Sequence, residues 1–246
     1  MEKLLKCFVI LAVLLGSSYA ADIYWTNNGS DQVWTNTANW NGQILPGVED
    51  VARLNKEFDI RPFFSDGMNE TVKAVIIGMS DGNSAGFEMT GGTLTLTGAF
   101  SVNDPNTANH RARFDMSGGT LSLTDNNNFR VGWNDNDAWF NMTGGLVTAG
   151  YGNVGEKASI VLQGGTVDIR WNWTMDGGSV MDIREGTLIV RNADAREEQI
   201  QGYIDAGNII AYGGAGKVSM TRNGSVLTVT ATGKTIRLIL LKSSGF

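Results

Sequence analysis

Two acid–arginine pairs have the residue types and the spacing needed to act on a polysaccharide. Asp168 and Arg170 are two positions apart, and Asp182 and Arg184 repeat this arrangement, as we expect, one coil later. Residues two apart in a strand point to the same side, so each acid would lie beside a cation. Glycosidases use two carboxylates that face a cleft, and lyases need a base beside a neutralised acid. The alternative interpretation is that these pairs are ordinary surface ion pairs, and we favour it over catalysis.

A polar and aromatic stretch, GWNDNDAWF at residues 132–140, is the better candidate for binding a sugar. The residues assigned to this site are Trp133, Asn134, Asp135, Asn136 and Asp137, with Asn127 from the preceding turn. The apolar face of a pyranose ring stacks on an aromatic side chain, while amides and carboxylates bind its hydroxyls. In the alternative interpretation, the Asx residues only form turns and Trp139 closes a corner of the fold. We favour that alternative for Trp139 and leave Trp133 open.

Composition restricts the partners and cofactors. The chain has 19 basic and 25 acidic residues and a formal net charge of -6, which argues against nucleic acid or an anionic membrane as a partner. One histidine and one cysteine argue against zinc and against Cys/His nucleophile chemistry. The Asx clusters have the oxygen ligands that calcium prefers, but they follow no calcium-loop pattern. We therefore expect no cofactor, and a polysaccharide or another surface component as the partner.

The first twenty residues predict export. MEKLLK is a short basic segment, CFVILAVLLG is an apolar run, and SSYA ends in a small-x-small pattern. This order is typical of a secretory signal peptide, and the apolar run is too short to anchor the chain in a membrane. Cleavage after Ala20 would remove Cys7, so we expect a secreted or cell-surface protein that is held together without disulfides and is not inserted in a membrane.

A strand–turn–strand unit that occurs five times indicates how these residues are positioned. The copies are FEMTGGTLTL from Phe87, FDMSGGTLSL from Phe114, FNMTGGLVTA from Phe140, IVLQGGTVDI from Ile160 and MDIREGTLIV from Met181. Their starts are 27, 26, 20 and 21 residues apart, a period typical of a β-solenoid. We therefore predict an all-β fold, a single-stranded right-handed parallel β-helix of about five coils over residues 73–192.

Alternating apolar residues predict two ladders inside the coils, one on each side of the Gly-Gly turn. The first ladder comprises Phe87, Phe114, Phe140, Ile160 and Met181, and the second comprises Leu94, Leu121, Val147, Val167 and Leu188. The segments VIIG, FRVG and NVG predict a third strand in each coil, and extra residues after them predict loops at one corner of the early coils. Trp171 and Trp173 follow the inward Ile169 in phase, so we favour core packing for both.

Both ends of the stack need covers, because a solenoid otherwise exposes its last coil. Residues 21–72 carry Trp25, Trp34 and Trp40 and are expected to form an N-terminal cap. Residues 193–246 predict a helix and a β-hairpin. Asp194 and Glu197 match a capping box at the start of the helix, and Gly207 marks its end. The hairpin turn is expected at Asn223–Gly224.

The order of these motifs carries a resemblance to a known group. The tryptophan-rich opening from Trp25 to Ala52, the spaced M-[TS]-G-G-T-L copies and the EEQIQGYIDAGNIIAYGG segment at 197–214 resemble secreted bacterial autotransporter-associated or PEP-CTERM-type repeat β-helix proteins. This resemblance to pectin-lyase-like solenoids implies export and a place at the cell surface or in the extracellular matrix. No catalytic motif is carried over, and TIRLILLKSSGF departs from the Pro-Glu-Pro anchoring signal.

Three functions are consistent with this sequence, in decreasing order of preference. The first is a non-catalytic structural or adhesive protein of the cell surface or matrix, with self-association as one further property. The second is a carbohydrate-binding module that uses the corner at residues 125–139. The third is a polysaccharide lyase or hydrolase.

Overall fold

The computed structural model describes residues 20–78, 84–103, 111–124, 126–133 and 137–233. The expected signal peptide lies almost wholly outside these ranges. Three residues of the expected sugar site, Asn134, Asp135 and Asn136, lie outside them too.

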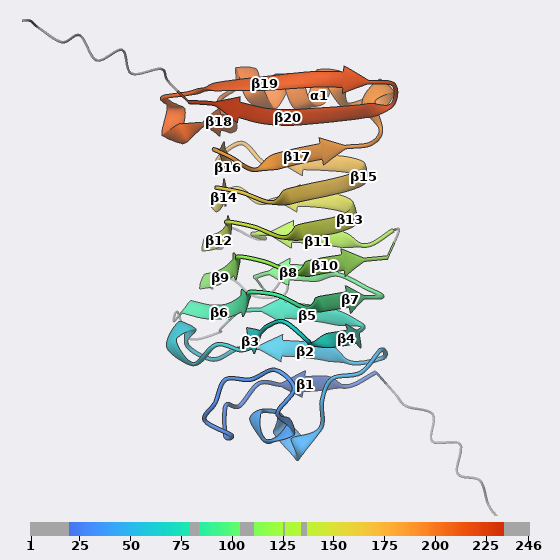
Figure 1. The fold of residues 1–246 in the computed structure, drawn as a ribbon, viewed down its shortest axis with the longest axis vertical. Coiled ribbons are helices and arrows are strands. Elements are labelled where there is room, and N and C mark those ends of the chain that lie inside the picture. The colour runs from blue at the N-terminus through green and yellow to red at the C-terminus, as the bar shows by residue number, and fades with distance from the viewer. Residues whose placement is uncertain (1–19, 79–83, 104–110, 125, 134–136, 234–246) are drawn as a thin grey trace, which may run out of the picture.

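The chain winds into a parallel β-solenoid of about six turns (Figure 1). One face of the solenoid is a seven-stranded sheet made of β3 (Phe63–Phe64), β6 (Ser84–Met89), β9 (Arg111–Met116), β12 (Asp137–Met142), β14 (Ala158–Leu162), β16 (Val180–Ile183) and β18 (Ile209–Ala211). Each of these strands pairs in parallel with the strand of the next coil. The predicted all-β parallel β-helix is confirmed, with about one coil more than expected.

The remaining strands form a thirteen-stranded sheet that provides the other faces of the coils. They are β1 (Asp22–Tyr24), β2 (Val51–Leu54), β4 (Asn69–Val72), β5 (Ala74–Ile77), β7 (Thr93–Leu96), β8 (Phe100–Val102), β10 (Thr120–Leu123), β11 (Asn128–Val131), β13 (Leu146–Val154), β15 (Thr166–Met175), β17 (Thr187–Val190), β19 (Lys217–Asn223) and β20 (Val226–Thr232). In the early coils a bend separates two strands, as between β10 and β11. In later coils β13 and β15 run through that bend as single long strands, and β13 pairs with both β10 and β11.

Both predicted ladders are present, and they form the centre of the core. Phe114 pairs in register with Phe87 and Phe140, and all three side chains are fully buried. The rings of Phe87 and Phe114 stack at 5.4 Å between centroids, and those of Phe114 and Phe140 at 5.1 Å. On the other side of the turn, Leu121 pairs with Leu94 and Val147. Alternation along each strand therefore places like residues above one another, and each coil buries the apolar surface of its neighbours.

The Gly-Gly turn is required by the closeness of successive coils. Gly119 has φ +79°, a backbone conformation that side chains other than glycine rarely adopt. At Gly118 the constraint is space, because a β-carbon would lie 2.4 Å from the carbonyl oxygen of Thr90 in the preceding coil. The two glycines thus have different roles, one conformational and one steric.

The N-terminal cap is built around three tryptophans, as predicted. Trp34 is fully buried, and its ring meets the rings of Trp40 at 4.8 Å and Phe87 at 5.4 Å. Trp25 packs edge-on against Trp40 at 5.1 Å. Three short 3-10 helices, η1 (Thr37–Asn39), η2 (Asn41–Gln43) and η3 (Phe58–Ile60), connect this region. The parallel pairing begins earlier than residue 73, since β2 already pairs with β5, and this explains the additional coil.

The C-terminal cap has the expected elements but differs in two details. The helix α1 (Ala193–Asp205) ends before Gly207, which has φ +78°. The predicted capping box is wrong: Asn192 is the N-cap, and Asp194 and Glu197 both pair with Arg222 of the hairpin instead. The hairpin turn lies one residue later than expected, because Asn223 pairs with Val226 and leaves Gly224 as the first loop residue.

After α1, the chain adds β18 to the seven-stranded sheet and continues through the 3-10 helix η4 (Tyr212–Gly214). Strand β20 then pairs antiparallel with β17, which ends the parallel stack. Figure 1 shows the hairpin and α1 together at this end of the solenoid.

The two tryptophans of RWNWTM do not share the core. Trp173 is fully buried and packs on Gly152, where an added β-carbon would overlap its ring. Trp171 is 39% exposed. Alternation in β15 is interrupted at Arg170 and Trp171, which are both exposed, and it resumes at Trp173 and Met175 in the phase of Ile169. The pairing of β13 with β15 shifts by one residue at this interruption. The expectation that both tryptophans pack inside is therefore wrong for Trp171.

Candidate functional site

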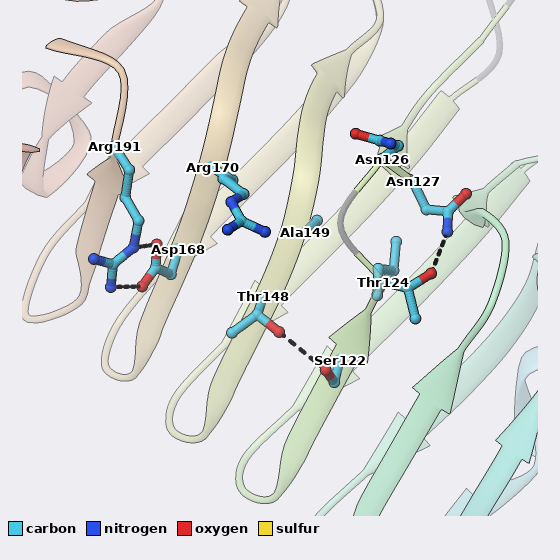
Figure 2. Close-up of a pocket in the computed structure, with 10 residues that line it drawn as sticks. Ser122, Thr124, Asn126, Asn127, Thr148, Ala149, Asp168, Arg170 and Arg191 are labelled. Carbon is cyan, nitrogen blue, oxygen red and sulfur yellow. Dashed lines mark hydrogen bonds and ion pairs between the residues drawn. The ribbon is translucent and has the colours of Figure 1, made fainter. Parts of the chain in front are cut away.

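A groove on the outer surface crosses four neighbouring coils (Figure 2). Its lining is mostly polar and comes from β10, β13 and β15, from the turn before β11 and from Arg191, the residue after β17. The residues that line it include Ser122, Thr124, Asn126, Asn127, Thr148, Asp168, Arg170 and Arg191. Because these strands alternate inward and outward residues, the same alternation that fills the core with Leu121, Val147 and Val167 places this polar row outside.

Strand register brings the outward row together. Thr148 pairs with Ser122 on one side and with Asp168 on the other. The hydroxyl of Thr148 donates a hydrogen bond to the Ser122 hydroxyl at 3.2 Å. One edge of the groove is the turn at Asn127, whose side-chain amide donates to the Thr97 carbonyl at 2.8 Å and to the Thr124 hydroxyl at 2.6 Å. The groove is thus lined by hydroxyl and amide groups held in fixed positions.

Asp168 is held by two hydrogen bonds from one guanidinium group. Arg191 donates from Nε to Oδ1 at 2.7 Å and from Nη2 to Oδ2 at 2.6 Å. These hydrogen bonds, with the attraction of the carboxylate charge, raise the pKa of Arg191. The carboxylate is only 13% exposed, and Arg170 on the same strand extends over the groove between Asp168 and Thr148 (Figure 2). Both carboxylate oxygens are therefore occupied by a permanent cation.

The two acid–arginine pairs do not form one site. Asp182 lies on β16, in the seven-stranded sheet, whereas Asp168 lies on β15 and pairs in register with Ile189 of the next coil. Asp182 binds Arg184 at 3.0 Å and accepts a hydrogen bond from the Gly213 backbone at 2.9 Å. The second pair does lie one coil later along the chain, but on the other sheet, because Asp168 follows a Gly-Gly turn while Asp182 precedes the equivalent turn.

The predicted sugar site is divided between two corners of the solenoid. Asn127 precedes β11 and Trp133 follows it, so the strand separates them by roughly 20 Å at the usual rise per residue. Asp137 begins β12, and its carboxylate lies 3.4 Å from Arg111. Trp133 is 39% exposed, as a platform for a sugar requires, but Asn127 belongs to the groove of Figure 2.

Different residues surround Trp133 from those that the sequence suggested. The Arg130 guanidinium lies 4.9 Å from the centre of its ring. A small hollow beside the ring is lined by Asn153, Thr174 and Asp176 from the next two coils. Asn153 pairs in register with Arg130, and Thr174 with Asn153. Aligning the third strands of successive coils would have found these residues, because they occupy the position of Arg130 in the coils that follow.

Trp139 does not close a corner. It lies half-buried on the outer side of β12 and lines a shallow depression with Phe58 and Arg113. The Phe58 ring covers Gly86 and lies near two guanidinium groups, Arg61 at 4.0 Å and Arg113 at 4.7 Å. The interpretation of Trp139 as a turn residue is wrong, because strict alternation in β12 places it opposite the buried Phe140.

No group of three or more His, Cys, Asp or Glu side chains gathers to hold a metal ion within the described ranges. Likewise, none of the helices described is both long and apolar enough to cross a membrane. Comparisons with protein-family models, with curated proteins and with solved structures each gave no match. The fold therefore defines the chain as a capped parallel β-solenoid with polar ligand-sized hollows on its outer faces.

Proposed function

We propose that this chain is a non-catalytic, exported adhesive or structural protein of the cell surface or extracellular matrix, and that it holds a polysaccharide along the groove of Figure 2. The observation that carries this proposal is the double hydrogen bond between Asp168 and Arg191 at the end of a row of outward hydroxyls.

The row has the dimensions of a binding track. Thr95, Ser122, Thr148 and Asp168 follow one another on adjacent strands. With strands about 4.8 Å apart, the row extends for roughly 14 Å along the solenoid. An extended glycan lying along this axis would meet a hydroxyl or carboxylate at every coil. Hydroxyl, amide and guanidinium groups are the partners that sugar hydroxyls use in binding sites.

The ion pair favours binding over catalysis. A general base must accept a proton at a free oxygen during the reaction, and a nucleophile must reach the substrate carbon. Both oxygens of Asp168 instead face Arg191, which stays protonated at physiological pH. Such a carboxylate holds its arginine in place, and the remaining lone pairs of its oxygens can accept hydrogen bonds from ligand hydroxyls without taking up a proton.

Two sequence features support export and an adhesive role. The first twenty residues match a secretory signal, and the continuous apolar ladders give a stiff body without disulfides. A long surface that repeats once per coil suits a partner that is itself a repeating polymer.

The test is a pull-down of residues 21–246 against insoluble and soluble polysaccharides, with the supernatants assayed for new sugar ends. We expect binding without release. Thr148→Val should weaken binding several-fold because it removes the central hydroxyl of the row. Ser159→Ala, an outward position on β14 of the other sheet, is the matched control and should bind normally. Release of sugar ends that Asp168→Asn abolishes would instead establish the enzyme interpretation.

A further inference from the structure

Arg130 is a partly buried arginine on β11 that meets no carboxylate among the described residues. Seven arginines in the described ranges contact a carboxylate: Arg53, Arg61, Arg111, Arg113, Arg184, Arg191 and Arg222. Arg130 contacts none of the described carboxylates, and its Nε is buried without a hydrogen-bond partner among the described residues. Its partial burial lowers the pKa of the guanidinium, because the charged form is moved partly out of water. A charge in this situation favours a ligand that brings a negative charge.

Trp133 places an apolar surface directly beside this cation. The indole ring lies 4.9 Å from the Arg130 guanidinium and is 39% exposed. A cation over an aromatic ring is attracted by it, but the ring does not neutralise the charge. The pair therefore offers both a site for an anionic group and an adjoining surface for the apolar face of a sugar ring.

Polar groups of the next coils complete the hollow. The Asn153 side-chain amide donates to the Thr174 hydroxyl at 2.7 Å, so both side chains are held in place. Asp176 is exposed and directly follows β15. This strand is two strands away from β11, which carries Arg130. The charge of Asp176 would repel an anion, so an acidic group is favoured only on the side of the Trp133 ring where the Arg130 guanidinium lies. Asp176 can accept hydrogen bonds from hydroxyls in the hollow.

We propose that Arg130 and Trp133 form a recognition site for an acidic sugar residue, with its carboxylate or sulfate on Arg130 and its ring on Trp133. This inference rests on the proposed function, because it takes the partner to be a polysaccharide, and it specifies that the polymer is anionic. The acidic net charge of the chain, -6, works against non-specific attraction of such polymers. Selective binding would therefore depend on this local cation.

The test compares polymers that differ only in charge, using residues 21–246. Polygalacturonate is compared with its methyl ester, and dextran sulfate is compared with dextran. The first comparison tests recognition of a carboxylate and the second tests recognition of a sulfate. Binding is measured by affinity electrophoresis. We expect one acidic polymer to bind about tenfold tighter than its neutral counterpart, the size of one charge-assisted hydrogen bond. Arg130→Gln should remove this preference, Arg130→Lys should keep most of it, and Asp176→Asn should strengthen it.

Controls separate this site from folding and from the groove of Figure 2. Arg113→Gln, which changes an arginine that already pairs with Asp115 at 2.8 Å, should leave the preference unchanged. The melting temperature of Arg130→Gln should equal or exceed that of the unchanged chain, because an uncompensated charge is removed. Equal binding of acidic and neutral polymers, or a preference that survives Arg130→Gln, would overturn the inference while leaving the proposed function intact. Absence of binding to any of the four polymers and to the wider pull-down panel would overturn both.

Discussion

Replacing Gly118 by alanine should destabilise the solenoid, because successive coils leave no room for a β-carbon at this turn. The added carbon would lie 2.4 Å from the Thr90 carbonyl oxygen, whereas ordinary contact begins at 3.4 Å. The difference, 3.4 minus 2.4, requires a local displacement of about 1 Å. That is a large fraction of the roughly 4.8 Å spacing between neighbouring strands.

This displacement would act on two backbone hydrogen bonds that flank the turn. Ser117 donates to the Met89 carbonyl at 2.9 Å, and Thr120 donates to the Gly92 carbonyl at 2.9 Å. Weakening one or both of these hydrogen bonds, together with the steric strain, should lower the free energy of unfolding by about 1–3 kcal/mol. For a chain of this size, that cost corresponds to a melting temperature lower by roughly 2–12 °C.

The assay is thermal unfolding of residues 21–246, followed by circular dichroism. Gly202→Ala is the matched control, because Gly202 lies within α1 and an added β-carbon there meets nothing within 4 Å. Alanine favours a helix over glycine by about 1 kcal/mol, so the control should melt slightly higher than the unchanged chain. If Gly118→Ala melted as high as Gly202→Ala, the close contact between coils at the Gly-Gly turn would be refuted.

Three other changes test separate parts of the structure. Trp34→Ala should lower the free energy of unfolding by about 3–5 kcal/mol, because it empties the centre of the N-terminal cap. In this variant, hydrogen exchange should show that β1 and β2 open earlier than β15. Hydrogen bonds from the Val33 backbone, and then from the Asn36 and Asn39 side chains, lower the pKa of Asp31. The ionised carboxylate therefore stabilises the fold above about pH 4, and this stabilisation is lost as the pH falls below that value. The melting temperature of Asp31→Asn should therefore fall less between pH 5 and pH 3 than that of the unchanged chain, and equal slopes would contradict this. Asp168→Asn, at an ion pair whose Arg191 side chain is 51% exposed, should lower the free energy of unfolding in urea by about 1 kcal/mol or less, and a larger loss would mean that Arg191 has a structural role.

The repeating part of the fold could be predicted because its signals are local. Alternation in FEMTGGTLTL fixes which residues face inward, and the following copies repeat the pattern. The ladder from Phe87 to Met181 is therefore correct to the residue. The same reasoning failed for Trp171, because a local irregularity in β15 interrupts the alternation at Arg170 and Trp171, and no sequence pattern marks it.

The sites were harder to predict because they combine residues from different coils and corners. Asn127 and Trp133 are close in sequence but lie at opposite ends of β11. Arg130 and Thr174 are far apart in sequence but lie two strands apart on one face. Coils of unequal length hide such relations, since the offset between equivalent positions changes from 27 to 20 residues. The capping box failed for a similar reason, because Arg222 from the hairpin competes for Asp194.

The orientation of the coils has a mechanical consequence. The first and last strands, β1 and the β19–β20 hairpin, lie at opposite ends of the solenoid (Figure 1). The hydrogen bonds between coils run along the line that joins these ends, so tension applied there would load one coil at a time rather than shear all strands together. Each opened coil of 20 to 27 residues would release roughly 70–95 Å of extended chain. Under load the molecule would therefore lengthen in steps, one coil at a time.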